Sequence, residues 1–130
     1  MRKVLGILAG IIVAMLTVAL VEFVGHRVYP PPSGMAMNDP AAVADYIAAM
    51  PAAAALFVVA AWFAGALTGG WTAIAITRWR AAAWLIGGLI AGAGIYNALQ
   101  IPAPLWMQLS TVLAPALGAW AALHLPRPPA

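Results

Sequence analysis

Charged side chains are scarce in this sequence. Its 130 residues include six basic and three acidic residues, so that 7% of the chain is charged and 65% is hydrophobic. An ordinary soluble domain is about 25% charged and about 45–50% apolar. The composition therefore excludes an ordinary soluble domain. It predicts an all-α polytopic membrane protein, with the lipid bilayer as the solvent of its helices.

Cysteine is absent, which excludes disulfides, thiolate metal sites and redox dithiols. The sequence also lacks a glycine-rich phosphate loop, a Ser/His/Asp set and a histidine-rich segment. Its basic residues stand singly or in pairs at the ends of apolar segments and form no patch with interleaved aromatic residues. We therefore expect no nucleic acid partner and no cofactor.

Four long apolar segments dominate the chain, at about residues 4–25, 51–76, 81–99 and 105–125. Each is close to the roughly 20 residues that a helix needs to cross the bilayer. The first segment follows Met1-Arg2-Lys3, as in a signal peptide, but it exceeds the apolar region of about 7–15 residues that a signal peptide has. The sequence predicts one membrane domain, residues 1–130, built as a four-transmembrane-helix bundle.

The one long polar segment, residues 26–50, lies between the first two spans. Three successive prolines at positions 30–32 exclude a helix there, because they remove backbone donors and favour polyproline geometry. Asp39 followed by Pro40 is typical of a helix start, with Asp39 as the N-cap. Apolar residues follow at helical spacing, so a short amphipathic helix is predicted in this outer loop, at the membrane interface.

The basic residues predict how the chain is oriented. On one side of the four-helix layout lie Arg2, Lys3, Arg78, Arg80 and Arg127. Arg27 alone lies on the other side. By the positive-inside rule, both termini face the cytoplasm and residues 26–50 face outward from the cell (inner) membrane.

Small residues recur at helical spacing in every predicted span. The glycines expected at helix contacts are Gly6, Gly10, Gly65, Gly69, Gly88, Gly92 and Gly118. In lipid, helices associate largely through close backbone approach at small residues, which favours a tightly packed bundle. The pattern does not separate an internal core from a surface for a partner or a second copy, and a general richness in glycine and alanine also produces it.

Polar residues inside the spans are the remaining candidates for chemistry. Glu22 is the only acidic residue in any span, and His26 follows one helical turn later on the same face. If the third helix runs outward, further polar residues reach the same level. The candidate polar cluster is Glu22, His26, Tyr96, Asn97, Gln100 and Gln108. Such a cluster handles protons or cations, or holds a polar headgroup. In the alternative, Glu22 reaches water at the headgroup boundary, and Asn97 and Gln100 anchor the outer turn.

Three functions are compatible with these residues. The first is a scaffold or accessory subunit that packs against itself or a larger membrane partner, and it needs no special side chain. The second is an oligomeric transporter or channel for a small solute, ion or proton that uses Glu22. The third is a lipid-active enzyme, for which Glu22 and His26 are the one candidate pair. A zinc ion needs a third protein ligand beside these two. We expect the first function, with no enzymatic activity and no metal site.

Overall fold

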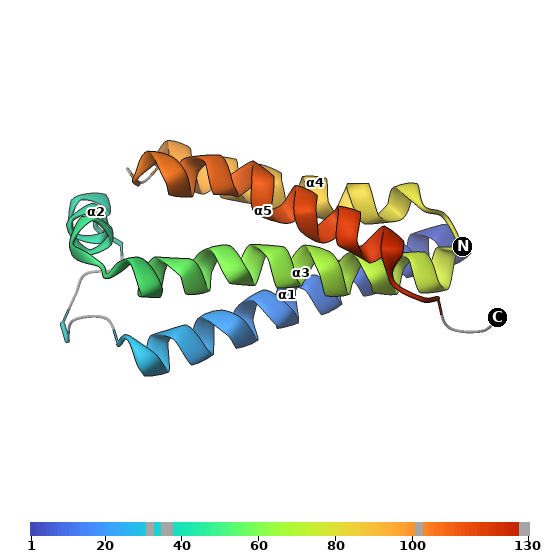
Figure 1. The fold of residues 1–130 in the computed structure, drawn as a ribbon, viewed down its shortest axis with the longest axis horizontal. Coiled ribbons are helices and arrows are strands. Elements are labelled where there is room, and N and C mark those ends of the chain that lie inside the picture. Colours follow the sequence, from blue (N-terminus) through green and yellow to red (C-terminus); the bar gives the residue numbers. More distant parts are fainter. Residues whose placement is uncertain (31–32, 35–37, 101–102, 128–130) are drawn as a thin grey trace.

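The computed structural model describes residues 1–130 apart from 31–32, 35–37, 101–102 and 128–130. Five helices follow one another: α1 (Arg2–Val28), α2 (Pro40–Ala49), α3 (Ala52–Thr77), α4 (Ala81–Gln100) and α5 (Leu105–His124). No strand occurs in the described ranges, so the all-α prediction is confirmed. The four long helices lie side by side along one axis, and α2 lies across one end of them (Figure 1).

Among the described residues, three helices are long and apolar enough to cross a membrane: α1, α3 and α4. The 20-residue helix α5 occupies the place of the fourth predicted span but is not one of these three. Its sequence includes Gln108, Ser110, Thr111 and Pro115, which lower its hydropathy. The three spans indicate a membrane protein, and the count of four crossings stays a prediction.

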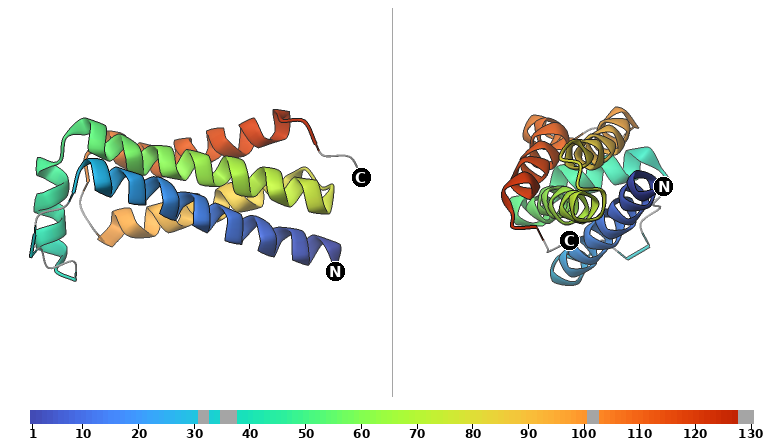
Figure 2. Two further views of the ribbon diagram at one scale, coloured as in Figure 1. Left: turned by 90° about the horizontal axis from the view of Figure 1, so that it is seen from below. Right: turned by 90° about the vertical axis from the view of Figure 1, so that its right-hand side faces the viewer.

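The short helix α2 begins where the Asp39-Pro40 pair predicts a helix start. The Asp39 side chain accepts a hydrogen bond of 3.1 Å from the backbone N–H of Ala41, and Pro40 is the first helical residue. Both features satisfy or avoid backbone donors that a helix N-terminus otherwise leaves unpaired. Figure 2 shows α2 roughly perpendicular to the long helices, at the end of the bundle far from the start of α1.

Helix α3 is the centre of the bundle, with α1 packed along one side and α4 and α5 along the other (Figure 2). Its interior positions are small, and Ala61, Ala66 and Ala73 are fully buried. A methyl group added to Gly10 of α1 would lie 2.7 Å from the carbonyl oxygen of Gly69 in α3. The helix backbones therefore touch directly, as expected where small residues face each other in lipid.

The predicted packing glycines divide into two groups. Gly6, Gly10, Gly65, Gly69 and Gly118 all lie against a neighbouring helix. A methyl group added to either of the other two, Gly88 or Gly92, would meet no described atom within 4 Å.

Inside the chain, α4 packs on α5 through a different pair of glycines. A methyl group added to Gly87 would lie 2.9 Å from the Cβ of Ala119. A methyl group added to Gly94 would lie 3.0 Å from the Cβ of Thr111. Gly88 and Gly92 therefore do not pack within the bundle, whereas the sequence left open both an internal contact and a surface for a partner. They share the helical spacing of a packing pair but lie on the outward face of α4.

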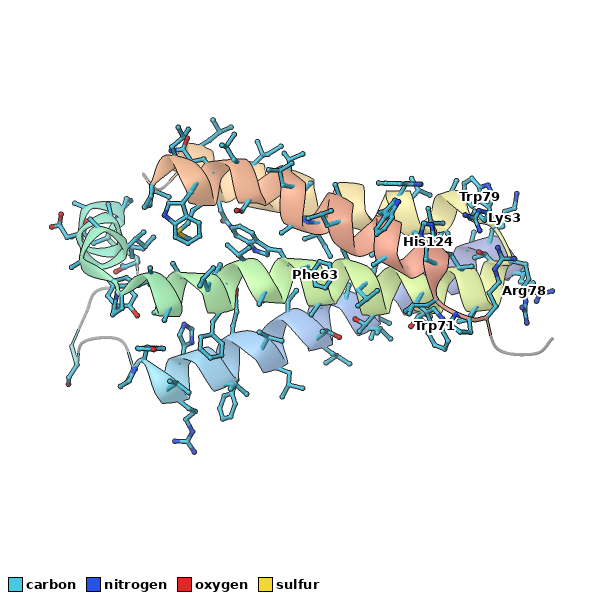
Figure 3. The ribbon with its side chains drawn as sticks, viewed as in Figure 1. Lys3, Phe63, Trp71, Arg78, Trp79 and His124 are labelled. Carbon is cyan, nitrogen blue, oxygen red and sulfur yellow. The ribbon has the colours of Figure 1, made fainter. Side chains whose placement is uncertain are left out.

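Basic residues gather where α1 begins and α3 ends. The Nε of Arg2 donates a hydrogen bond of 2.6 Å to the carbonyl of Ile76, and the Lys3 ammonium lies 4.9 Å from the ring centroid of Trp79. Figure 3 shows Lys3, Arg78 and Trp79 together at this end of the bundle. The contacts bring the start of α1 and the end of α3 to one end of the molecule.

Candidate binding groove

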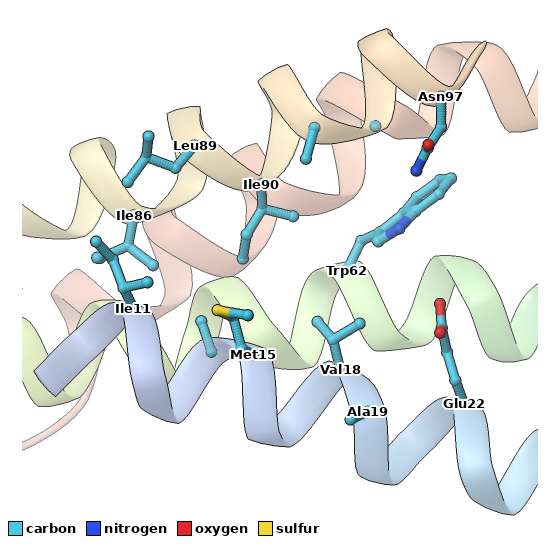
Figure 4. A pocket seen from close by; sticks show the side chains of 13 residues that line it. Ile11, Met15, Val18, Ala19, Glu22, Trp62, Ile86, Leu89, Ile90 and Asn97 are labelled. Atoms are coloured by element: carbon cyan, nitrogen blue, oxygen red, sulfur yellow. The ribbon is translucent and has the colours of Figure 1, made fainter. Parts of the chain in front are cut away.

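A groove separates α1 from α4. Both helices pack on α3, but they contact each other sparsely. At one end Ile11 packs against a buried cluster that includes Ile86, whereas toward the other end the two helices diverge and Trp62 of α3 lies between them (Figure 4). The space has a volume of about 620 Å³. This volume lies in the range of about 300–1,000 Å³ that is typical of small-molecule sites.

The two walls of the groove have the same residue pattern. On α1 the lining residues Ile11, Met15, Val18 and Glu22 recur at intervals of four, three and four residues. On α4 the lining residues Ile86, Ile90, Ala93 and Asn97 recur at the same intervals. These intervals keep side chains on one face of a helix. Because α1 and α4 run in the same direction, the two polar residues arrive at the same end of the groove (Figure 1).

Three polar side chains therefore meet at the wide end of an otherwise apolar groove. Figure 4 shows the Glu22 carboxylate and the Asn97 amide pointing from opposite walls toward the indole of Trp62. Glu22 and Trp62 are half-buried, and Asn97 is exposed. Every other residue that lines this groove within the described ranges is apolar.

Glu22 also borders a second, smaller hollow between α1, α2 and α3. His26, Tyr29 and Tyr46 line it, and its volume of about 20 Å³ suits a single water molecule. His26 itself is exposed. The predicted pairing of Glu22 with His26 thus falls in this hollow, outside the groove that holds Asn97.

The remaining members of the predicted cluster lie elsewhere. Tyr96 and Gln100 are exposed and line neither space, and the Gln108 amide donates a hydrogen bond of 2.9 Å to the carbonyl of Ala103. Trp62 was not in that cluster. The signal that could have pointed to it is a tryptophan inside an apolar span, since a buried indole N–H usually needs a hydrogen-bond partner.

Threonine hydroxyl groups in the helices donate to backbone carbonyls. Thr68 donates to the carbonyl of Ala64 and Thr72 to that of Thr68, both at 2.8 Å. The hydroxyls of Thr17 and Thr68 also lie 2.8 Å apart and join α1 to α3. In contrast, the side chains of Glu22, Trp62 and Asn97 form no hydrogen bond with any residue that the structure describes. Their donors and acceptors are available to a ligand.

The groove offers one carboxylate, one amide and one indole donor on apolar walls. This set suits binding better than nucleophilic chemistry, which needs a nucleophile and an oriented base. The described part of the chain contains no group of three His, Asp or Glu residues placed to hold a metal ion. Comparison of the chain with protein-family models, curated proteins and solved structures found no match.

Proposed function

We propose that this protein is a small integral protein of the cell (inner) membrane that acts as a scaffold or accessory subunit. It packs side by side with a second copy of itself or with a larger membrane protein. The observation that supports this function is the outward face of α4. Gly88 and Gly92 are the only glycines of the described helices at which an added methyl group would meet nothing within 4 Å.

A pair of glycines on the outward face of α4 lowers the stability of an isolated bundle. Glycine in a helix interior is less favourable than alanine by about 1 kcal/mol. Glycines four residues apart, however, allow the backbone of a second helix to come close, which is a principal source of helix association in lipid. Large apolar residues flank the pair, since Leu85 and Ile95 are 43% exposed. The outward face of α4 is therefore shallow at the two glycines and has large apolar side chains on either side of them.

The distribution of charge supports the proposed orientation. Arg2, Lys3, Arg78 and Arg80 lie where α1 begins and α3 ends, which the positive-inside rule assigns to the cytoplasm. The Trp71 indole donates a hydrogen bond of 2.8 Å to the carbonyl of Pro126, beyond the end of α5. The start of α1 and the end of α5 therefore lie at the same end of the bundle, as four crossings require.

Cross-linking in native membranes tests the proposed contact. The chain has no cysteine, so Ile95→Cys places a single thiol on the same exposed face as Gly88 and Gly92. A bismaleimide joins two thiols, so it is expected to give a product of twice the protein's mass for self-association, or of another mass for a partner that has a cysteine within reach. Adding Gly88→Leu and Gly92→Leu should reduce the yield at least about tenfold, because leucine holds the helices apart.

A matched control uses the other side of the same helix. Ala93→Leu enlarges a small exposed residue of α4 that lines the groove, and it should leave the Ile95→Cys product unchanged. Gly88→Ala should retain most of the product. A yield that is insensitive to leucine at positions 88 and 92, in a correctly folded protein, would contradict the proposal.

An oligomeric transporter of a small solute, ion or proton is the second candidate. The half-buried Glu22 in the groove favours it, since an acidic side chain in a span often marks a transport pathway. Liposome uptake that Glu22→Gln abolishes would support transport. Absence of flux together with the glycine-dependent cross-link would support the scaffold.

A further inference from the structure

The groove between α1 and α4 has the shape and polarity of an amphiphile. Its apolar part extends along α1 from Ile11 to Val18, and its polar end begins at Glu22. At a rise of 1.5 Å per residue, Glu22 lies about 16 Å from Ile11 along the helix axis. This length suits a medium-length alkyl chain with a headgroup beside Glu22.

Charge selects the kind of headgroup. Glu22 is the only charged residue among the described residues that line the groove. The nearest basic side chains face elsewhere: His26 borders the smaller hollow, and the Arg27 guanidinium lies 5.4 Å from the ring centroid of Phe23. An anionic headgroup would therefore face a carboxylate, and none of the described residues that line the groove is basic.

A cationic headgroup fits the same three side chains. A carboxylate forms charge-assisted hydrogen bonds with an ammonium group, and the face of a tryptophan ring attracts cations. Glu22 and Trp62 supply these two partners side by side, and the Asn97 amide adds a polar group on the facing wall (Figure 4).

We propose that this groove binds a monocationic single-chain amphiphile. Its ammonium group lies at Glu22 and Trp62, and its alkyl chain lies between α1 and α4 toward Ile11 and Ile86. This inference goes beyond the proposed scaffold function and does not depend on it. At 100° per residue, Gly88 is about 160° around α4 from the groove residue Ile90. The centres of the two surfaces therefore lie on opposite sides of α4, and the groove residue Leu89 lies at their border.

Equilibrium dialysis of the whole protein in a neutral detergent tests the proposal, with labelled dodecylammonium as the probe. The wild-type protein should bind one probe per chain in a saturable manner. Glu22→Gln should weaken binding at least about tenfold, because the charge-assisted contact is lost. Asp45→Asn is the matched control, since it removes an exposed acidic charge from α2, outside the groove, and should leave the affinity unchanged.

A second pair of variants tests the place of binding without changing Glu22. Ala93→Phe fills the groove from an exposed position on α4 and should abolish saturable binding. Ile95→Phe adds a similar bulk to the outward face of α4 and should not affect binding. These two variants show whether the probe binds in the groove even if Glu22→Gln does not fold.

Three results would overturn the proposal. The first is binding by wild type no stronger than by Glu22→Gln. The second is equal, Glu22-independent binding of labelled dodecanol, which would show that the groove takes alkyl chains without recognising charge. The third is a co-purified phosphatidylethanolamine that Glu22→Gln loses and that dodecylammonium does not displace, which would assign the groove to a lipid headgroup.

Discussion

Individual glycines differ in what surrounds them. At Gly10 and Gly69 the backbones of α1 and α3 touch. A methyl group added to Gly92, by contrast, would meet no atom of another described helix within 4 Å. A larger side chain therefore has different effects at a packed glycine and at an outward-facing glycine. At the first it separates two packed helices, and at the second it extends into the surroundings.

Gly10→Leu is expected to destabilise the isolated protein. The new side chain would meet the Gly69 carbonyl oxygen, 2.7 Å from the position of its Cβ, and the Cβ of Ala73, 2.9 Å away. Overpacking of this kind costs about 1–3 kcal/mol in free energy of unfolding. Unfolding in detergent with increasing dodecyl sulfate, followed by circular dichroism, measures the change.

Gly92→Leu is the control for this measurement. Its free energy of unfolding should not fall and should rise by up to about 1 kcal/mol, because leucine favours a helix more than glycine does and the new side chain meets no neighbouring helix. Equal losses of unfolding free energy in Gly10→Leu and Gly92→Leu would show that the two glycines do not differ in their packing. Together with the cross-linking yields, the comparison separates a folding role from an association role.

At the scale of the helix, α2 depends on its N-terminal cap. Asp39 accepts a hydrogen bond from the N–H of Ala41, and among the described residues of α2 only Val43 is buried. Packing therefore contributes little to this short helix. A helix of 10 residues is marginal by itself in water.

Asp39→Ala is expected to weaken α2 by about 1 kcal/mol, since it removes the cap acceptor. Amide hydrogen exchange over Pro40–Ala49 should become several-fold faster, while exchange in α3 should not change. Asp39→Asn keeps an acceptor and should retain most of the protection. Asp45→Ala, which removes an acidic residue inside the same helix, should not accelerate exchange; a similar acceleration there would argue against capping as the cause.

At the scale of the whole molecule, the bundle places α2 at one end and the basic residues at the other (Figures 1 and 3). The arrangement is consistent with four crossings, although only α1, α3 and α4 meet the length and apolarity of a span among the described residues. Whether α5 crosses determines on which side the chain leaves the membrane.

Single-cysteine labelling is expected to place Ser33 and Leu125 on opposite sides of the membrane. The cysteine-free chain gives no background reaction. A membrane-impermeant maleimide should label Ser33→Cys in intact cells, and Leu125→Cys only after permeabilisation, because the positive-inside rule predicts that the basic end of the bundle faces the cytoplasm.

The other labelling patterns have distinct meanings. Labelling of both cysteines in intact cells would show that α5 does not cross. Labelling of Leu125→Cys alone would show that the orientation is reversed. Permeabilised cells, in which both variants should react, control for thiols that are buried.

Much of the fold could be predicted from local properties of the chain. The apolar segments predicted at residues 51–76 and 81–99 correspond to α3 and α4, and the Asp39-Pro40 pair marks the start of α2. These features depend on hydrophobicity and on capping within a few residues. The prediction of the site was less complete. The candidate polar cluster included Glu22 and Asn97 but not Trp62.

The sequence by itself determined the apolar helices, the start of α2 and the ends that carry basic residues, because each is encoded in neighbouring residues. The tertiary structure decided which glycines touch, that Gly87 and Gly94 pack in place of Gly88 and Gly92, and that Glu22, Trp62 and Asn97 share one groove. The physical reason is that helices that are apolar on all sides have no polar face to fix their rotation. Close packing of small residues along their whole length sets which sides meet.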